Sequence, residues 1–386
     1  LTGFDLEAPE ARLMPGTVKE MRLGWSLVLV GVAALSSAET LRMGTWNVTN
    51  YTGTNRGSAF QNAIYGTYQG RSFAPDVLFA QEIESPSAAQ TFRGLLNTAA
   101  GSPGDWNVIF NTLTGTSGTN ANNQAMFYRT SKVHSPSVTV VASPSSTAGA
   151  RQTLRFDFQL AGNATAEIFS VYNLHLKAGN TTDDQNRRQA EATAVRNNAN
   201  SLTGNRQIMA VGDFNWQSSS QTAWTTFTGS TSNNNGRFFD PIATTGSWTE
   251  NNNFRFVHTQ DPSGSGGMDD RYDLMLMGGK LGDGTGTEYV GAFGTAYSTT
   301  TWNDPNHSYR VWGNDGTSFN DTLTISGNAM VGSSIAQSLV TTATVNGGHL
   351  PVFADFRYDV VPEPASMVAL GAGLLALVRR RRSTRS

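Results

Sequence analysis

Short apolar segments that end in a carboxylate, an amide or an imidazole recur along this chain, and they constrain its fold more than any other feature. Residues 41–48 and 76–80 are the first two, and both are typical of strands. The clearest helix is predicted over 184–202, where apolar residues recur at three- and four-residue spacing after two aspartates. Strands that precede or alternate with helices predict a mixed α and β fold without an obvious linker to a second domain.

The other predicted elements follow the same patterns. Strands are expected at 106–110, 124–128, 138–141, 153–158, 167–172, 208–211, 271–277 and 351–358, and helices at 58–69 and 87–98. Stretches rich in Gly, Ser, Asn and Thr at 111–123, 228–236 and 260–267 are expected to be loops. The irregular segment 280–347 separates two core strands, and two interpretations remain open: a long surface insertion or a substrate-facing lobe.

Polar residues at the strand ends are the candidate functional groups. A sheet that gathers these ends would bring three carboxylates, two imidazoles and two amides to one edge, where ligands commonly bind. They are Asn47, Glu82, His175, Asp213, Asn215, Asp273 and His349. By contrast, Arg187 and Arg188 near the start of the long predicted helix are expected on its solvated face rather than at a phosphate.

Charge and cysteine content exclude several classes of function. The whole chain has a formal net charge of −2, and residues 39–360 hold 19 basic and 24 acidic residues, hence about −5. Since nonspecific nucleic-acid binders usually present a basic field, any nucleic-acid chemistry here requires a cation or a local patch. The absence of cysteine excludes disulfides, zinc ribbons, iron–sulfur clusters and a cysteine nucleophile.

The N-terminal region has the pattern of a secretory signal peptide. Met21-Arg22 precedes a mostly apolar run at 25–35, and Ser36-Ser37-Ala38 offers small residues for cleavage. The apolar run is too short to span a membrane. We therefore expect a signal peptide over 21–38, with residues 1–20 preceding the true start of translation.

The C-terminal region, residues 361–386, has a different order of features. Pro362-Glu363-Pro364 precedes twelve apolar residues at 367–378 and four arginines at 379–382. This order resembles the PEP-CTERM sorting tail of Gram-negative bacteria. The resemblance implies transient insertion of the tail as a transmembrane helix, its removal by a membrane protease (an exosortase), and an extracellular or cell-surface protein. A basic tail that binds nucleic acid is the alternative, and it leaves the apolar run unexplained.

Six motifs between residues 41 and 358 resemble those of the endonuclease/exonuclease/phosphatase superfamily, the fold of DNase I and exonuclease III. In order they are Gly-Thr-Trp-Asn at 44–47, Gln-Glu at 81–82, Asn-Leu-His-Leu at 173–176, Gly-Asp-Phe-Asn at 212–215, Tyr-Asp-Leu at 272–274 and His-Leu-Pro-Val at 349–352. Each motif alone is weak, but six in the family's order form a specific signal. The resemblance implies a four-layer α/β sandwich in 39–360, with two packed mixed sheets flanked by helices, and we expect a monomer.

The resemblance also implies a role for each candidate residue. Glu82 would supply the main carboxylate for Mg²⁺ or Mn²⁺, which favour oxygen ligands, and Asn47 would support the metal site.

The remaining five residues would act on water and phosphate. Asp213 would orient or deprotonate the attacking water, and Asn215 would position phosphate or water. His175 would hydrogen-bond a phosphate oxygen. His349 would stabilise the developing charge or transfer a proton, and Asp273 would orient its imidazole.

One departure from the family pattern bears on activity. The family usually places Ser-Asp directly before the final histidine, where this chain has Gly347-Gly348. The predicted function is a secreted, divalent-metal-dependent phosphodiesterase, first of all a nuclease that hydrolyses extracellular DNA or RNA. The first alternative is an enzyme for another phosphate ester, such as a phospholipid headgroup, an inositol phosphate or a nucleotide. The second is a non-catalytic surface or matrix protein on the same fold.

Overall fold

A computed structural model describes residues 37–111, 123–145, 147, 151–264, 266–344 and 347–361. The expected signal peptide lies outside these residues except for its last two positions, which begin the first strand, and the sorting tail lies outside them beyond residue 361. No helix within the described part of the chain is long and apolar enough to cross a membrane.

The first sheet contains the N- and C-terminal strands of the described chain. Its order is β11 (Glu288–Tyr289), β13 (Val352–Val360), β1 (Ser37–Tyr51), β2 (Val77–Ile83), β4 (Asn123–Arg129) and β3 (Trp106–Phe110), and β12 (Arg310–Val311) also pairs with β13. β1 runs parallel to β2 and antiparallel to β13. The sheet is therefore mixed, and the carboxyl ends of β1 and β2 share one edge with the beginning of β13.

The second sheet is built from the middle of the chain. Its order is β5 (Val133–Ala142), β6 (Thr153–Leu160), β7 (Ile168–His175), β8 (Arg206–Asp213), β10 (Asp273–Gly278) and β9 (Phe238–Phe239). Only β7 and β8 are parallel to each other. Because β10 is antiparallel to β8, its first residue lies beside the last residue of β8.

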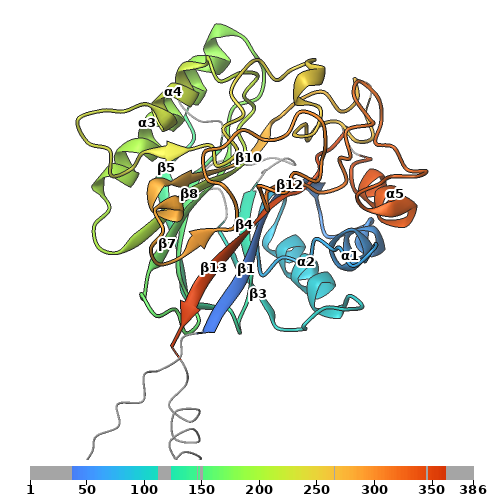
Figure 1. The fold of residues 1–386 in the computed structure, drawn as a ribbon, viewed down its shortest axis with the longest axis horizontal. Helices are drawn as coiled ribbons and strands as arrows, with labels where there is room; N and C mark the ends of the chain where they lie inside the picture. The colour runs from blue at the N-terminus through green and yellow to red at the C-terminus, as the bar shows by residue number, and fades with distance from the viewer. Residues whose placement is uncertain are drawn as a thin grey trace, which may run out of the picture.

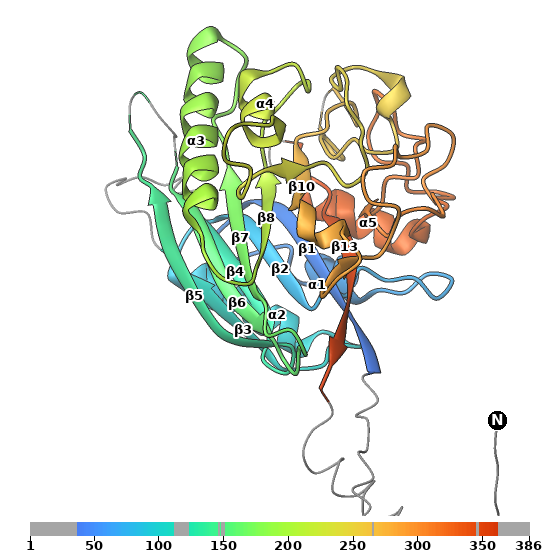
Figure 2. The ribbon, with the colours of Figure 1, turned by 60° about the vertical axis from the view of Figure 1, so that its left-hand side comes forward.

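The two sheets lie face to face (Figure 2). Apolar side chains from both fill the space between them. Phe79 on β2 contacts Phe156 and Phe158 on β6, with ring centroids 6.1 and 6.5 Å apart. All three rings are buried, and each such side chain stabilises the fold by about 1.5–3 kcal/mol. This contact between the sheets forms the centre of the molecule.

Helices cover the outer face of each sheet (Figure 1). The first sheet is covered by α1 (Gly57–Tyr65), α2 (Pro86–Thr98) and α5 (Gly332–Thr342), and the second by α3 (Thr182–Ser201) and α4 (Thr222–Thr228). Two short 3₁₀ helices, η1 (Asn252–Phe254) and η2 (Gly279–Gly282), lie in the connections. These four layers confirm the predicted α/β sandwich.

The beginning of α3 corrects one expectation. Thr181 and Asp184 form a reciprocal capping box, so the helix starts two residues before the predicted position. Arg188 is fully buried rather than solvated, and it donates hydrogen bonds to the carbonyls of Lys177 (2.6 Å) and Gly179 (2.7 Å). Helical periodicity alone does not show that a charged residue is needed to hold the preceding loop.

The irregular segment 280–347 contributes to the same hydrophobic core as the sheets. It contains β11, β12 and α5, and Tyr309, Trp312 and Leu339 from this segment are buried with core residues of β1 and β13. Trp312 donates a hydrogen bond to the carbonyl of Ala63 on α1 at 2.9 Å. This part of the chain therefore packs as part of the domain.

Candidate active site

Strand direction brings the predicted residues to one edge of the sandwich. Asn47 and Glu82 lie near the carboxyl ends of the parallel strands β1 and β2, and His175 and Asp213 are paired neighbours at the ends of β7 and β8. Asp273 begins β10 opposite Asp213. His349 precedes β13, and because that strand is antiparallel to β1, its beginning lies at the same edge.

Asn47 joins the ends of the two sheets. Its Nδ2 donates hydrogen bonds to Glu82 Oε1 at 2.9 Å and to Asp213 Oδ2 at 3.2 Å. Its Oδ1 accepts from the backbone N–H of Thr49 at 3.0 Å, and the N–H of Asn50 donates to Glu82 Oε2 at 2.8 Å. The irregular last residues of β1, where its pairing with β2 shifts register, therefore orient both the amide and the glutamate.

Several residues of the site have a positive φ, a backbone conformation that residues other than glycine rarely adopt. Glu82 has φ 63°, Asn215 has φ 50°, and Thr49 and Asn50 have φ 50° and 47°. The pairing register of β2 also shifts beside Glu82. Such conformations cost about 1–3 kcal/mol each and are concentrated at functional sites, so their clustering here supports the assignment of this edge as the candidate site.

The two histidines face the same carboxylates but differ in charge. His175 Nε2 lies 3.7 Å from Glu82 Oε1 and 3.5 Å from Asp213 Oδ2. Burial, reinforced by the charges of Arg151 and His349, lowers the pKa of His175 well below its usual value. This imidazole is therefore neutral at pH 7, and its Nδ1 has no hydrogen-bond partner among the described residues.

His349 is held in the opposite protonation state. Its Nδ1 lies 2.8 Å from Asp273 Oδ2, and its Nε2 lies 3.8 Å from Asp213 Oδ2. Burial alone would lower the pKa of His349, but the hydrogen bond and charge of Asp273, with the charges of Asp213 and Glu82, raise it to about 10. Trp46 holds the backbone of His349 by a 2.9 Å hydrogen bond to its carbonyl.

Asp213 lies between the two imidazoles. Burial raises its pKa, the charges of Asp273 and Glu82 act in the same direction, and those of His349 and Arg151 oppose them. The backbone N–H of Asn215 donates to Asp213 Oδ1 at 3.0 Å, and Asn215 Nδ2 donates to the carbonyl of Leu176 at 3.2 Å. Asp213 is thus a buried, oriented carboxylate that can bind a proton.

Sequence reasoning missed the polar layer directly beneath the site. Gln81 Nε2 donates to Asn173 Oδ1 at 2.7 Å, and this hydrogen bond joins the two sheets. The same Nε2 also donates to Thr45 Oγ1, on the neighbouring strand of its own sheet, at 2.9 Å. Asn173 Nδ2 donates to the carbonyls of Ala80 and Ala125, both at 3.1 Å. The signal was present, because Gln81 and Asn173 are polar residues within apolar strands and belong to the quoted motifs.

A guanidinium beside the site was also missed. Arg151 donates a hydrogen bond to the carbonyl of Leu176 at 3.1 Å. Burial lowers the pKa of Arg151, whereas the carboxylates of Asp213, Glu82, Glu191 and Glu84 raise it. It follows a Ser- and Ala-rich stretch without periodicity, so no sequence pattern indicated that it would face the carboxylates.

The oxygen-rich donor set fits a hard cation. Within the described ranges no three or more His, Cys, Asp or Glu side chains form a metal cage. Mg²⁺ does not need one, since it often binds one or two carboxylates and keeps several waters. Burial is the largest cause of the raised pKa of Asp213, and the charges of Asp273 and Glu82 add to it, so a nearby cation would favour the ionised carboxylate. The carboxylate of Glu82 can coordinate such a cation. Asn47 directs its Nδ2 towards the carboxylates of Glu82 and Asp213, so in this orientation it is a hydrogen-bond donor to them.

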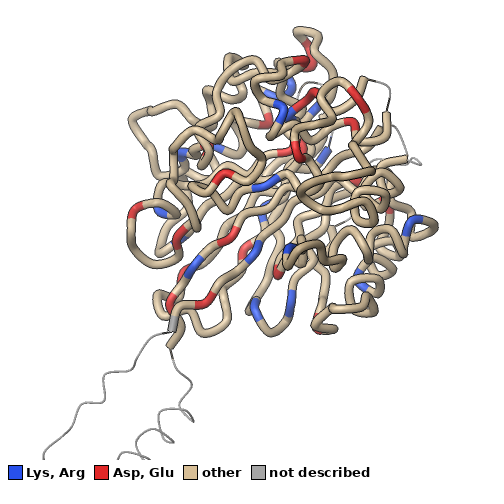
Figure 3. The backbone as a smooth tube through the Cα atoms, turned by 45° about the vertical axis from the view of Figure 1, so that its right-hand side comes forward, with Lys and Arg blue, Asp and Glu red and all other residues tan. Residues whose placement is uncertain are grey.

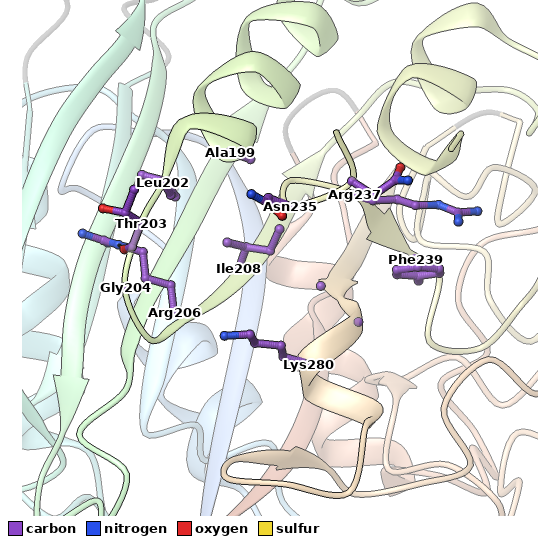
Figure 4. Close-up of a pocket in the computed structure, with 13 residues that line it drawn as sticks. Ala199, Leu202, Thr203, Gly204, Arg206, Ile208, Asn235, Arg237, Phe239 and Lys280 are labelled. Atoms are coloured by element: carbon purple, nitrogen blue, oxygen red, sulfur yellow. Dashed lines mark hydrogen bonds between the residues drawn. The ribbon is translucent and has the colours of Figure 1, made fainter. Parts of the chain in front are cut away.

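A cavity of about 600 Å³ lies elsewhere, at the beginning of β8 and the end of β10 (Figure 4). Three cationic residues line it, but two of them are directed to other groups. Arg206 pairs with Asp157 at 3.3 Å, and Arg237 stacks on Phe239 at 4.7 Å and donates to the carbonyl of Thr228. The cavity therefore lacks the converging polar groups of the strand-end site.

A comparison with protein-family models finds a match at the C-terminal tail. Residues 360–382 match the protein-family model described as "PEP-CTERM protein-sorting motif", which confirms the predicted sorting tail. No curated protein sequence matches the chain.

Solved structures similar to this fold include the three that follow. One is an endonuclease/exonuclease/phosphatase from Bacteroides vulgatus, with 13% identity, coverage of 82% of this chain and 98% of that chain, and a TM-score of 0.49. Another is the human Nocturnin catalytic domain with a bound sulfate anion, with 14% identity, coverage of 83% and 97%, and a TM-score of 0.47. The third is a mannosyl-6-phosphatase from Bacteroides thetaiotaomicron, with 14% identity, coverage of 82% and 99%, and a TM-score of 0.47. At these identities the similarity concerns the fold alone.

Proposed function

We propose that this chain is an exported, divalent-cation-dependent phosphoric ester hydrolase. The observation that carries the proposal is the pair of buried imidazoles held in opposite charge states around one carboxylate. His175 is neutral, His349 is protonated, and both lie within 4 Å of Asp213. Neighbouring groups with pKa values driven apart are typical of acid and base partners in hydrolysis.

Asp213 acts on the attacking water. Its Oδ2 is shared by Asn47 and the two imidazoles, and its Oδ1 is held by the backbone of Asn215. Because burial raises its pKa, Asp213 can accept a proton from water near neutral pH. Asn215 orients that carboxylate and positions water or phosphate.

The two imidazoles act on the phosphate ester. His349 carries a positive charge at Nε2, where it stabilises charge that develops on the phosphate or donates a proton, and Asp273 fixes its orientation. His175, neutral and buried, offers an Nε2–H to a phosphate oxygen.

Glu82 would hold Mg²⁺ or Mn²⁺, with Asn47 supporting the glutamate. When bound, the cation supplies the Lewis acid charge that polarises the phosphate.

The preferred substrate is extracellular DNA or RNA, and a small phosphate ester is the second candidate. A specific observation favours the second: Lys and Arg are interspersed with Asp and Glu over the folded domain in Figure 3 rather than gathered into one region. A nonspecific nucleic-acid binder usually depends on a basic field. The sorting motif supports export, with removal of the tail by an exosortase at the cell surface.

Hydrolysis by the purified chain tests this proposal. Plasmid DNA, single-stranded DNA, RNA and bis-p-nitrophenyl phosphate would be offered with Mg²⁺, Mn²⁺ or EDTA. We expect cation-dependent turnover that falls about 10²–10⁴-fold in His349→Ala and Glu82→Gln. His134→Ala, a change of an exposed histidine on β5, is the matched control and should retain activity.

The substrates separate the candidates. Cutting of nucleic acid supports the nuclease, and turnover of the small diester alone supports the second candidate. No turnover with any cation would overturn the enzymatic proposal and favour a non-catalytic surface protein on this fold.

A further inference from the structure

A loop from the second half of the chain packs directly against the two glycines that precede His349. The backbone N–H of Ser263 donates to the carbonyl of Gly347 at 3.1 Å, and the N–H of Leu350 donates to the carbonyl of Thr259 at 2.8 Å. These contacts lie on both sides of His349. The loop at 259–264 is therefore part of the wall beside that histidine.

Asp261 fills the space above Gly347. A Cβ added to Gly347 would lie 2.5 Å from Asp261 Cγ and 2.7 Å from its Oδ1, closer than any real contact. Gly347 also has a backbone φ of +79°, which residues other than glycine rarely adopt. The glycine thus brings the carboxylate of Asp261 against the main chain two residues before His349.

The burial of the Asp261 carboxylate is energetically unfavourable. Asp261 Oδ1 is buried and accepts no hydrogen bond from the residues that the structure describes. Burial raises the pKa of Asp261 to about 6, the charge of His349 opposes that rise, and the charge of Asp270 adds to it. A buried, unsatisfied acceptor normally destabilises a protein, so its presence beside a functional group points to a use for its charge.

We propose that Asp261 is a positioning residue for His349: its carboxylate, packed against Gly347, supplies a further negative charge, besides those of Asp273, Asp213 and Glu82, that holds the imidazolium. It acts together with Asp273, which contacts the ring directly. The inference rests on the proposed function only for its effect on turnover. The electrostatic coupling of the two side chains stands independently of any substrate.

Other charged groups also surround Asp261 and His349. His349 faces Asp273 on β10, Asp213 on β8, Glu82 on β2 and Asp270 on the adjacent loop, and its charge also affects His175 on β7.

Asp261 faces Asp270. Burial raises the pKa of the neighbouring Asp269 to about 7, and the charges of Asp270, Asp261 and Glu250 add to that rise. Protonation of Asp261 near pH 6 would therefore remove one of several negative charges, and its effect on His349 should appear only above that pH.

Titration of His349 by NMR tests the coupling directly. The full chain, labelled with ¹³C at histidine and kept in EDTA, would be compared with Asp261→Asn. We expect a small inflection of the His349 signal near pH 6 in the native protein that is absent in the variant, and a fall of about one unit in the pKa of His349. Asp283→Asn, at an exposed aspartate beyond η2, is the matched control. An unchanged His349 titration in Asp261→Asn would overturn the proposal.

Thermal unfolding separates this role from a structural one. The folded-state pKa of Asp261 is raised above its usual value, so its contribution to stability is present at low pH and is lost as the pH rises through about 6. Asp261→Asn should therefore unfold at a higher temperature than the native protein at pH 8, with the difference shrinking towards pH 4. A lower unfolding temperature at pH 8 would indicate that Asp261 holds the loop together and would contradict the proposal.

Turnover provides the last readout. With a substrate that the native protein hydrolyses, Asp261→Asn should lower kcat with little change in KM and move the basic limb of the pH profile of kcat by the same shift as the pKa of His349. Asp261→Glu should recover part of kcat. An inactive native protein would defeat the proposed function while leaving the NMR result to decide the role of Asp261.

Discussion

At the scale of single residues, the opposite charges of His175 and His349 arise from their partners. Both side chains are almost fully buried, at 4% and 6% exposure, and burial favours the neutral ring in each. His349 differs because Asp273 hydrogen-bonds its Nδ1 directly. Asp273 therefore contributes most to the charge that lets His349 donate a proton, and Asp213 and Glu82 add to it.

This difference predicts how stability depends on pH. The folded-state pKa of His349 is about 10, above its usual value, so its contribution to stability is complete below about pH 6.5 and is lost as the pH rises through 10. We expect the free energy of unfolding of the native protein to exceed that of His349→Gln by an amount that declines over this window. Urea unfolding of both proteins at pH 6, 8 and 10 would measure it, and a constant difference would contradict the assigned charge.

Asn47 predicts a second effect at this scale. Asn47→Ala would leave Glu82 Oε1 and Asp213 Oδ2 without the amide donor that now serves both. Because unsatisfied buried acceptors are costly, we expect a loss of about 1–3 kcal/mol in the free energy of unfolding at pH 7. Urea unfolding checks this value, with the exposed Asn303→Ala as control. Equal stability of the two variants would show that the site does not depend on the bridge.

At the scale of elements, the parallel pair β7–β8 sets the distance between His175 and Asp213. Gly212 precedes Asp213 and has φ +127°, and a Cβ there would lie 2.1 Å from the carbonyl oxygen of Leu174. Only glycine lets the two strands approach at this point. The fold therefore depends on this position for the geometry of the site as well as for its stability.

Gly212→Ala should consequently destabilise the protein by at least about 3 kcal/mol and reduce turnover. The matched control is Gly204→Ala, which also has a positive φ, +85°, but meets no atom within 4 Å. That variant should lose only about 1 kcal/mol, the cost of the left-handed conformation for alanine. Chemical denaturation distinguishes the two, and similar losses would show that close approach of the strands is not the constraint.

The elements also show why sequence analysis succeeded in part. Most strands, α2 and the strand-end residues were predicted because apolar runs end where polar side chains begin. Helix α4 has the Thr-rich sequence TAWTTFT, which is a poor helix former. Its Trp224 and Phe227 pack on Trp216, so tertiary contacts hold a helix that local propensity does not predict.

The roles of Arg151 and Asp261 were unpredictable for a related reason. Arg151 follows a Ser- and Ala-rich stretch and Asp261 lies in a Gly- and Ser-rich one, and each reaches the site only through folding. Asp261 meets Gly347, which is 86 positions away in the chain, and Arg151 meets the carbonyl of Leu176 across a connection between strands. No local pattern encodes such contacts.

At the scale of the whole molecule, the site lies where the ends of two sheets meet. The first sheet supplies Asn47, Glu82 and His349, and the second supplies His175 and Asp213. Gln81 and Asn173 join the sheets beneath these residues. Any ligand that bridges the two sets of side chains should therefore stabilise the complete fold.

Cation binding provides the corresponding prediction, and it requires no substrate. A divalent cation held by Glu82 binds only the folded chain, so Mg²⁺ at about 100 times its dissociation constant should add about 2.7 kcal/mol to the free energy of unfolding. Thermal unfolding with increasing Mg²⁺, Mn²⁺ or EDTA measures the effect. Glu82→Gln should abolish the rise in unfolding temperature, whereas Glu288→Gln on β11 should retain it. A rise that persists in Glu82→Gln would place the cation elsewhere, and no rise in the native protein would remove the metal from the proposed mechanism.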